Sequence, residues 1–174
     1  MRRPAIDSWT TDVEAAELAR RAAGRMVLEV GTFKGFGTVL MAQAGATVWA
    51  VDWHRGDAVL GATDTLCAWW TNVRRHHVED QVVGLVGRSE TVLPMLRPAS
   101  FDLAFVDAEH SYEAAAADIQ LTLPLVKPGG LLLFHDYSAV WPGVVRAVDE
   151  LAASGRAERA SPPTVGSLAA LILR

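Results

Sequence analysis

Short apolar runs alternate with segments of helix length from Met26 onward, and this alternation restricts the fold more than any other feature of the sequence. Apolar runs of about five residues that are rich in valine, leucine or phenylalanine are typical of strands buried on both faces. Strands of this kind that alternate with helices form a parallel sheet with helices on both sides. The expected strands are residues 26–30, 47–51, 81–86, 102–106 and 130–135.

Helical spacing of apolar residues, near i, i+4 and i+7, marks three of the intervening segments. The residues that carry this spacing are Leu66, Trp70 and Val73, then Tyr112, Ala116 and Ile119, then Val144, Val148 and Leu151. A further helix is expected at residues 11–23. Residues 155–160 and 167–173 are expected to pair as an antiparallel hairpin, with its turn at 161–164.

These elements predict a Rossmann-like, doubly wound α/β sheet with helices on both faces. If the strands are numbered along the chain, the expected order is 3-2-1-4-5-7-6, and the hairpin forms one edge. The 174 residues, of which 51% are hydrophobic, suffice for one substantial core but not for two. A single domain that spans residues 1–174 is therefore expected.

Charge and hydropathy exclude several classes of partner. The net charge is −4, and charges of both signs are scattered without a basic stripe, so no nucleic acid is expected as a partner. The sequence has neither a signal-peptide core nor an apolar stretch that could span a membrane, which predicts a cytoplasmic protein without a membrane partner. The lone cysteine, Cys67, is expected to pack within an apolar helix.

A turn rich in glycine connects the first expected strand to a helix. Its glycines are Gly31, Gly35 and Gly37, which is not the dinucleotide spacing G-x-G-x-x-G. A tight turn alone can require glycine, and so can the close approach of a ligand to the backbone. Asp52 ends the second strand about twenty residues later, where a carboxylate can accept hydrogen bonds from the two hydroxyls of a ribose. Together these features favour a nucleoside site.

Polar residues also follow the later strands. Ser89 comes just after the third strand, where it could cap the next helix or face an adenine ring. Asp107 follows the fourth strand and Asp136 the fifth. Because neighbouring strands are about 4.8 Å apart, both carboxylates can face one cavity at the carboxyl edge of the sheet.

Four segments carry a family resemblance when they are taken together and in order: 29–35 (EVGTFKG), 106–112 (VDAEHSY), 125–130 (LVKPGG) and 134–137 (FHDY). They resemble class I S-adenosylmethionine-dependent methyltransferases. The resemblance is greatest to the branch of macrocin-type and cephalosporin-hydroxylase-type O-methyltransferases, which is related to catechol O-methyltransferases. It implies that Glu29 and Gly31 hold the methionine part of S-adenosylmethionine, that Asp52 holds the ribose, and that Ser89 lies by the adenine. The full set of implied cofactor-binding residues is Glu29, Gly31, Thr32, Gly35, Asp52, Trp53, Arg88, Ser89 and Asp107.

The same resemblance implies a divalent metal, usually Mg²⁺, bound at Asp107 and Asp136, with His110 and Asp107 as the catalytic residues. Metal-dependent relatives commonly have a second carboxylate where this chain has His135. An imidazole in that place leaves room for His135 as a ligand of a softer divalent cation, or for no metal.

The expected activity is transfer of a methyl group to a small-molecule acceptor, with a hydroxyl oxygen as the expected target. Trp9, Trp53 and Trp141 could line the acceptor pocket, although packing roles fit them too. Residues 54–63 could roof that pocket, or a second subunit of a homodimer could complete it.

Two other functions stay open. One is a non-catalytic protein that binds S-adenosylmethionine, which the departure at His135 suggests. The other is an NAD(P)-dependent short-chain oxidoreductase, whose chemistry needs a tyrosine and a lysine four residues apart. The only lysines are Lys34 and Lys127, and neither follows Tyr112 or Tyr137 at that spacing.

Overall fold

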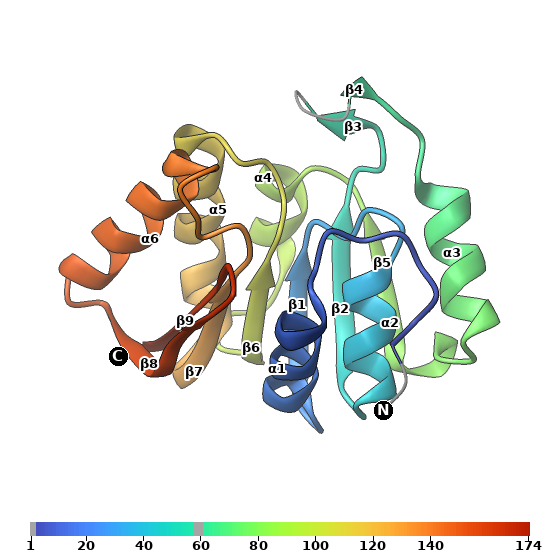
Figure 1. Ribbon diagram of the computed structural model, residues 1–174, viewed down its shortest axis with the longest axis horizontal. Helices are drawn as coiled ribbons and strands as arrows, with labels where there is room; N and C mark the ends of the chain where they lie inside the picture. Colours follow the sequence, from blue (N-terminus) through green and yellow to red (C-terminus); the bar gives the residue numbers. More distant parts are fainter. Residues whose placement is uncertain (1–2, 58–60) are drawn as a thin grey trace.

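A seven-stranded sheet forms the centre of the protein in the computed structural model, which describes residues 3–57 and 61–174 (Figure 1). The strand order is β5-β2-β1-β6-β7-β9-β8. The strands are β1 (Met26–Val30), β2 (Thr47–Asp52), β5 (Val82–Val86), β6 (Phe101–Val106), β7 (Val126–Phe134), β8 (Ala157–Val165) and β9 (Leu168–Leu173). The first five of these pair in parallel, and β9 pairs antiparallel with both β7 and β8. The order expected from the sequence is therefore confirmed for this sheet.

Helices cover both faces of the sheet (Figure 1). They are α1 (Asp12–Ala22), α2 (Phe36–Gln43), α3 (Leu66–Arg75), α4 (Ser89–Val92), α5 (Tyr112–Thr122) and α6 (Pro142–Ala153). Because successive side chains of a strand point to opposite faces, β1 contributes Val27 to the core beneath α1, α2 and α3, and Leu28 to the core beneath α4, α5 and α6. Both side chains are fully buried, which explains the continuous apolar run of this strand.

Side-chain caps fix the first turns of α1 and α5. Thr11 and Glu14 form a capping box at the start of α1. The hydroxyl of Ser111 accepts the backbone N–H of Ala114 and caps α5.

The expected inner face of α3 is wrong by one position. Trp69 is 3% exposed and packs in the core, whereas Trp70 is 44% exposed. Cys67 is also exposed, so its expected packing role is wrong as well. Adjacent tryptophans give two possible helix phases, and the glycines at positions 35 and 84 decide between them because each leaves room for the Trp69 indole.

The expected turn of the C-terminal hairpin is also displaced. β8 continues through residues 161–163 to Val165, and the turn is formed by Gly166 and Ser167. β8 is an edge strand, where proline is tolerated because its missing N–H faces away from the sheet, and the register shifts between Arg159 and Thr164.

A small hairpin of β3 (Gly56–Asp57) and β4 (Gly61–Ala62) projects above the carboxyl edge of the parallel strands (Figure 1). It falls within the segment 54–63 that could roof the pocket, and residues 58–60 of that segment lie outside the described residues. Within the described chain, every helix is too short or too polar to cross a membrane.

Candidate active site

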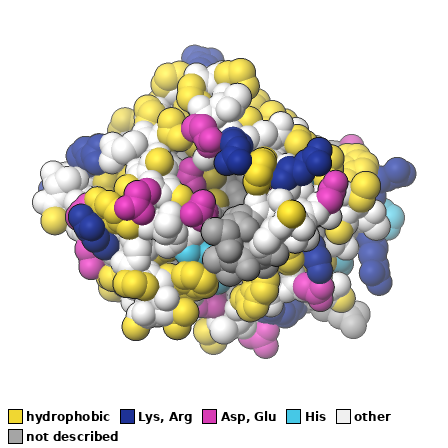
Figure 2. All heavy atoms as spheres, turned by 90° about the horizontal axis from the view of Figure 1, so that it is seen from above, with side chains coloured by type: hydrophobic (Ala, Val, Ile, Leu, Met, Phe, Trp, Pro, Cys, Tyr) yellow, Lys and Arg dark blue, Asp and Glu magenta, His cyan; other side chains and the backbone are white. Residues whose placement is uncertain are grey.

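A cavity of about 790 Å³ opens at the carboxyl edge of the parallel strands. Viewed onto that edge, acidic side chains lie along one side of a hollow, and histidine is visible beside it (Figure 2). Of the residues expected in the site, those that line the cavity are Glu29, Gly31, Thr32, Asp52, Trp53, Arg88, Ser89, Asp107, His110, His135 and Asp136. The sheet topology thus gathers residues from five strand ends around one space.

The turn after β1 requires glycine at its first position for two reasons. Gly31 has a φ of +86°, in the region that side chains rarely adopt. A Cβ atom at this position would also lie only 2.1 Å from the carbonyl oxygen of Asp107. Gly35 does not belong to the described lining of the cavity: it precedes α2 with a φ of +88° and packs against Trp69. Its requirement for glycine is structural.

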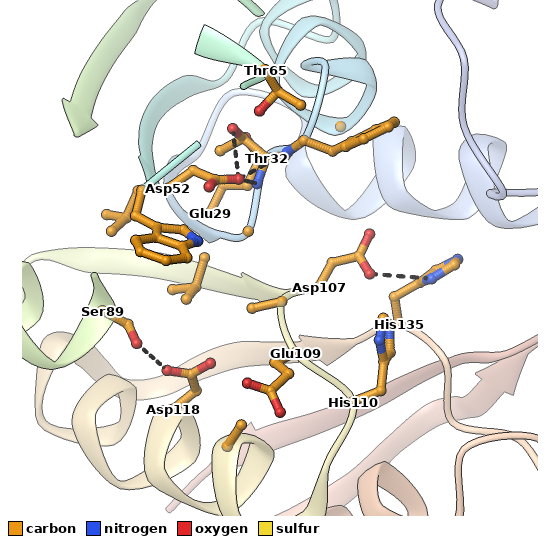
Figure 3. Close-up of a pocket in the computed structure, with 18 of the residues that line it drawn as sticks. Glu29, Thr32, Asp52, Thr65, Ser89, Asp107, Glu109, His110, Asp118 and His135 are labelled. Carbon is orange, nitrogen blue, oxygen red and sulfur yellow. Dashed lines mark hydrogen bonds and ion pairs between the residues drawn. The ribbon is translucent and has the colours of Figure 1, made fainter. Parts of the chain in front are cut away.

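Asp52 fixes this turn from the end of β2. One carboxylate oxygen, Oδ2, accepts the backbone N–H groups of Thr32 at 2.8 Å and Phe33 at 2.9 Å, and the Thr32 hydroxyl at 3.3 Å (Figure 3). The other oxygen, Oδ1, accepts the N–H of His54 at 2.7 Å. The carboxylate is therefore held rigidly beside the cavity by main-chain donors, with an orientation that does not depend on a ligand.

Glu29 lies in the floor of the cavity and is 1% exposed. Its Oε2 accepts the hydroxyl of Thr38 at 2.5 Å, and the Trp69 indole N–H donates to the same hydroxyl at 3.1 Å. Burial raises the pKa of the Glu29 carboxyl to about 8, and the nearby carboxylates of Asp107 and Asp52 add to the rise against the opposing hydrogen bond from Thr38. Glu29 is therefore largely protonated at neutral pH when the cavity holds no cation.

This shift predicts that the unfolding free energy decreases as pH rises from about 4.5 to about 8. In that window the unfolded chain has lost the Glu29 proton while the folded protein keeps it, and the effect is on the order of 4 kcal/mol. Glu29→Gln should show a shallower pH dependence, because only the contributions of other groups with a raised pKa, such as His135, remain. Urea unfolding of both proteins at several pH values between 4.5 and 8.5 would measure the difference, and parallel pH profiles would contradict the prediction.

The turn after β5 contributes Arg88 and Ser89. The guanidinium of Arg88 lies 3.8 Å above the ring of Trp53, and both residues line the cavity. Ser89 begins α4 but does not cap it, because Arg88 occupies the N-cap position. Instead, the Ser89 hydroxyl donates to Oδ1 of Asp118 on α5 at 2.5 Å (Figure 3). No pattern in the sequence pointed to Asp118 as a site residue.

Asp107, His110 and Asp136 form a compact group on the far side of Gly31 from Ser89. Among the described residues, one potential ligand atom from each of the three lies within 4.8 Å of the others. The Nε2 atom of His110 is 2.7 Å from Oδ2 of Asp136. The His110 ring stacks on Trp141 at 4.3 Å, which fixes its plane. Asp136 has a φ of +57°, an uncommon conformation that is concentrated at functional sites.

His135 lies behind this group rather than within it. It is 5% exposed, and its Nδ1 is 3.4 Å from Oδ1 of Asp107 and 3.1 Å from Oδ2 of Asp136. Burial opposes the imidazolium form, but the two carboxylates outweigh burial and raise the pKa of His135 to about 11. For Asp136, burial acts to raise the pKa of the carboxyl. The hydrogen bonds from His110 and His135 outweigh burial and hold this pKa well below its ordinary value. The two carboxylates thus favour the imidazolium form of His135, and the group of ligand atoms within 4.8 Å of one another contains His110.

Glu14 is a further carboxylate that the sequence did not single out. It is 3% exposed, and its Oε2 is 3.7 Å from Nε2 of His135. Its Oε1 accepts the N–H and the hydroxyl of Ser167 at 2.5 and 2.8 Å, and its Oε2 accepts the N–H of Thr11 at 2.7 Å. Burial opposes ionisation, but the hydrogen bonds from Thr11 and Ser167 outweigh it and lower the pKa of Glu14 to about 2. The sequence predicts a helix at the position of α1 but not the proximity of Glu14 to His135.

The three tryptophans expected at the acceptor pocket have different places. Trp9 is 72% exposed, lies 5.5 Å from the ring of Phe33, and lines the cavity. Trp53 lines it too, and its indole N–H donates to the carbonyl of Gly56 at 2.7 Å. Trp141 supports His110 from outside the described lining.

Comparison with known proteins agrees with this geometry. Residues 28–137 match the sequence model of a family described as a methyltransferase domain. Catechol O-methyltransferase of Mycobacterium tuberculosis is 30% identical over 119 residues, which cover 67% of this chain and 50% of the relative. An uncharacterized protein of Acanthamoeba polyphaga mimivirus, R132, is 28% identical over 148 residues, which cover 78% of this chain and 62% of that protein. The chain thus spans about half to three fifths of the length of these curated relatives.

A solved structure has the same fold. The O-methyltransferase TomG from Streptomyces achromogenes, involved in tomaymycin synthesis and crystallised in complex with SAM (S-adenosylmethionine), superimposes with a TM-score of 0.69 and 26% identity. The match covers 91% of this chain and 77% of TomG.

The family match extends over more than half of the chain, from β1 to just beyond β7, and includes both the glycine turn and the Asp107 group. This chain therefore belongs to the methyltransferase-domain family, among the class I S-adenosylmethionine-dependent methyltransferases that its motifs resemble.

Proposed function

We propose that this protein transfers the methyl group of S-adenosylmethionine to a hydroxyl oxygen of a small-molecule acceptor. The observation that carries the proposal is that one cavity joins a nucleoside-type site, with Gly31 and Asp52, to the group of Asp107, His110 and Asp136. The TomG complex with SAM and the catechol O-methyltransferase relative support the cofactor and the oxygen target.

In this reaction the acceptor oxygen forms a bond to the methyl carbon while the bond between carbon and sulfur breaks, and its electron pair stays on sulfur. The protein has to align oxygen, carbon and sulfur and to remove the hydroxyl proton. The fixed turn at Gly31 and the fixed carboxylate of Asp52 orient the cofactor. The pair of His110 and Asp136 accepts the proton, which Nε2 of the imidazole and Oδ2 of the carboxylate share across their 2.7 Å contact.

The same group fits a divalent cation by the chemistry of its donor atoms. Asp107 and Asp136 offer carboxylate oxygens and His110 offers a nitrogen, a set that suits Mn²⁺ or another transition metal as well as Mg²⁺. A cation bound by these residues would lower the pKa of the acceptor hydroxyl. Two of its three ligands would be the residues expected from the sequence, and His110 would be the third.

Calorimetric titration of the protein with S-adenosylmethionine tests the cofactor assignment. We expect saturable binding that weakens roughly a hundredfold in Asp52→Ala, since two hydrogen bonds from ribose to a charged group are lost. Asp12→Ala is the matched control, because Asp12 is an exposed carboxylate on α1, away from the cavity lining. A folded wild type that binds NAD but not S-adenosylmethionine would favour the oxidoreductase alternative and contradict the proposal.

The transfer step needs its own assay. Isotope-labelled methyl groups should pass to hydroxyl-bearing small molecules, and a chelator with and without added Mg²⁺ or Mn²⁺ would show whether a cation takes part. Cofactor binding without transfer to any member of a broad acceptor panel would favour the non-catalytic alternative. Sedimentation of the protein alone would test whether it is a homodimer.

A further inference from the structure

The carboxyl group of Asp118 is a buried titratable group in the cavity wall that the proposed mechanism does not use. Asp118 lies on α5, which also lines the cavity with Glu113 in its first turn and with Ala114, Ala117 and Leu121, and is 5% exposed. A carboxyl group buried on a helix of alanines is unfavourable unless its polar atoms have partners. The Asp118 carboxyl group is therefore expected to have hydrogen-bond partners for both of its oxygens.

Among the described residues, protein groups satisfy only one of the two oxygens of the Asp118 carboxyl group. Ser89 donates to Oδ1 at 2.5 Å, and the described residues provide no hydrogen bond to Oδ2. Figure 3 shows the carboxyl group between Ser89 and Glu109, on the side of the cavity opposite Asp107 and His110. The second oxygen is thus available to a ligand in the cavity.

The order of residues across the sheet indicates which part of the cofactor lies there. Asp107 follows β6, Gly31 follows β1, Asp52 ends β2, and Ser89 follows β5, and these strands are neighbours in that order. A cofactor with its sulfur near Asp107 and its ribose at Asp52 places its base beyond Asp52, beside Ser89. Asp118 faces that same space.

We propose that Asp118 is a specificity-determining residue that hydrogen-bonds the amino edge of the cofactor's adenine and rejects bases with a carbonyl there. This inference rests on the proposed function, because it assumes an S-adenosyl cofactor in the cavity. Adenine presents an exocyclic amine that donates beside a ring nitrogen that accepts. A neutral carboxyl group offers the complementary acceptor and donor, as an amide does when it pairs with adenine.

The surroundings of Asp118 shift the equilibrium of its carboxyl group toward this neutral form. Burial raises the pKa of its carboxyl, and the neighbouring carboxylates of Glu90 and Glu109 raise it further against the hydrogen bond from Ser89. Because the Ser89 hydroxyl donates to Oδ1, the proton of the acid belongs on Oδ2, where it faces the ring nitrogen. The base hypoxanthine, which carries an N–H at that nitrogen and a carbonyl beside it, would meet the wrong partner at both positions.

The test compares the binding of S-adenosylhomocysteine and S-inosylhomocysteine by calorimetry. Wild type should bind the adenosyl compound at least about tenfold more tightly. Asp118→Asn should keep this ratio within a few fold, since an amide has the same donor and acceptor. Asp118→Ala should bring the ratio close to one.

Control measurements separate a recognition role from a structural one. Ser89→Ala removes the partner of Asp118 without removing the carboxyl group, and it should retain a preference for adenine. An unchanged ratio in Asp118→Ala would overturn the inference. If that variant fails to fold, a wild type that binds both compounds equally would overturn it just as well. A folded wild type that binds neither compound would instead contradict the proposed function.

Discussion

Gly31→Ala should lose more than about 3 kcal/mol of unfolding free energy, together with measurable cofactor binding. Two costs add at this position: a φ of +86° and a Cβ that would lie 2.1 Å from the carbonyl oxygen of Asp107. Backbone atoms on both sides would have to move, which would shift the strand end that carries Asp107. Urea unfolding and calorimetric titration with S-adenosylmethionine would measure the two losses.

Gly24→Ala is a matched control for this prediction. Gly24 has a φ of +69°, but an added Cβ there meets no atom within 4 Å. It should cost only the strain of the left-handed conformation, about 1 to 2 kcal/mol, and leave cofactor binding unchanged. Equal losses in the two variants would show that the contact between Gly31 and the Asp107 backbone carries no particular energy.

Asp107→Asn should reduce the rate of methyl transfer by roughly a hundredfold or more. The amide keeps the shape of the side chain but removes the negative charge from the group that faces the acceptor hydroxyl, and it also removes a potential cation ligand. The loss should appear in kcat to a greater extent than in the affinity for S-adenosylmethionine. Rate measurements at saturating cofactor, with a direct binding measurement beside them, would separate the two effects.

Asp102→Asn provides the comparison, because Asp102 lies at the opposite end of the same strand. Its carboxylate accepts the N–H of Met26 at 2.9 Å and forms an ion pair with Lys127 at 2.7 Å. This change should lower stability slightly and leave kcat unchanged. A similar loss of kcat in both variants would contradict a specific role for Asp107.

The sequence was sufficient to predict which residues meet at the edge of the sheet. Parallel strands that end at one edge bring together whatever follows them, so Asp52, Asp107 and Asp136 could be assigned to one region from strand positions alone. The exchange of His135 for His110 in the potential ligand set could not be predicted in this way. It depends on the positive φ of Asp136 and on the ring of Trp141, which are properties of the packed loops.

The contacts that residues from distant segments make near the site could not be predicted from the sequence either. Asp118 lies on a helix whose alanine-rich sequence gives no signal for a site, and Glu14, the third residue of α1, has a local role in the capping box of that helix. Their second contacts, to Ser89 and to His135, join positions 29 and 121 residues apart in the chain. Local patterns carry no information about such pairs.

The position of Glu14 also limits how far this chain can be shortened. The segment that defines the family runs from residue 28 to residue 137, so it begins after α1 and stops before the terminal hairpin. Yet Glu14 on α1, held by Ser167 in the turn of that hairpin, supplies the third carboxylate around His135. A fragment trimmed to the family segment would contain every motif residue and still lack the carboxylate that lies against His135. The first helix and the last two strands thus set the surroundings of His135, and a transplant of this site into another scaffold has to include them.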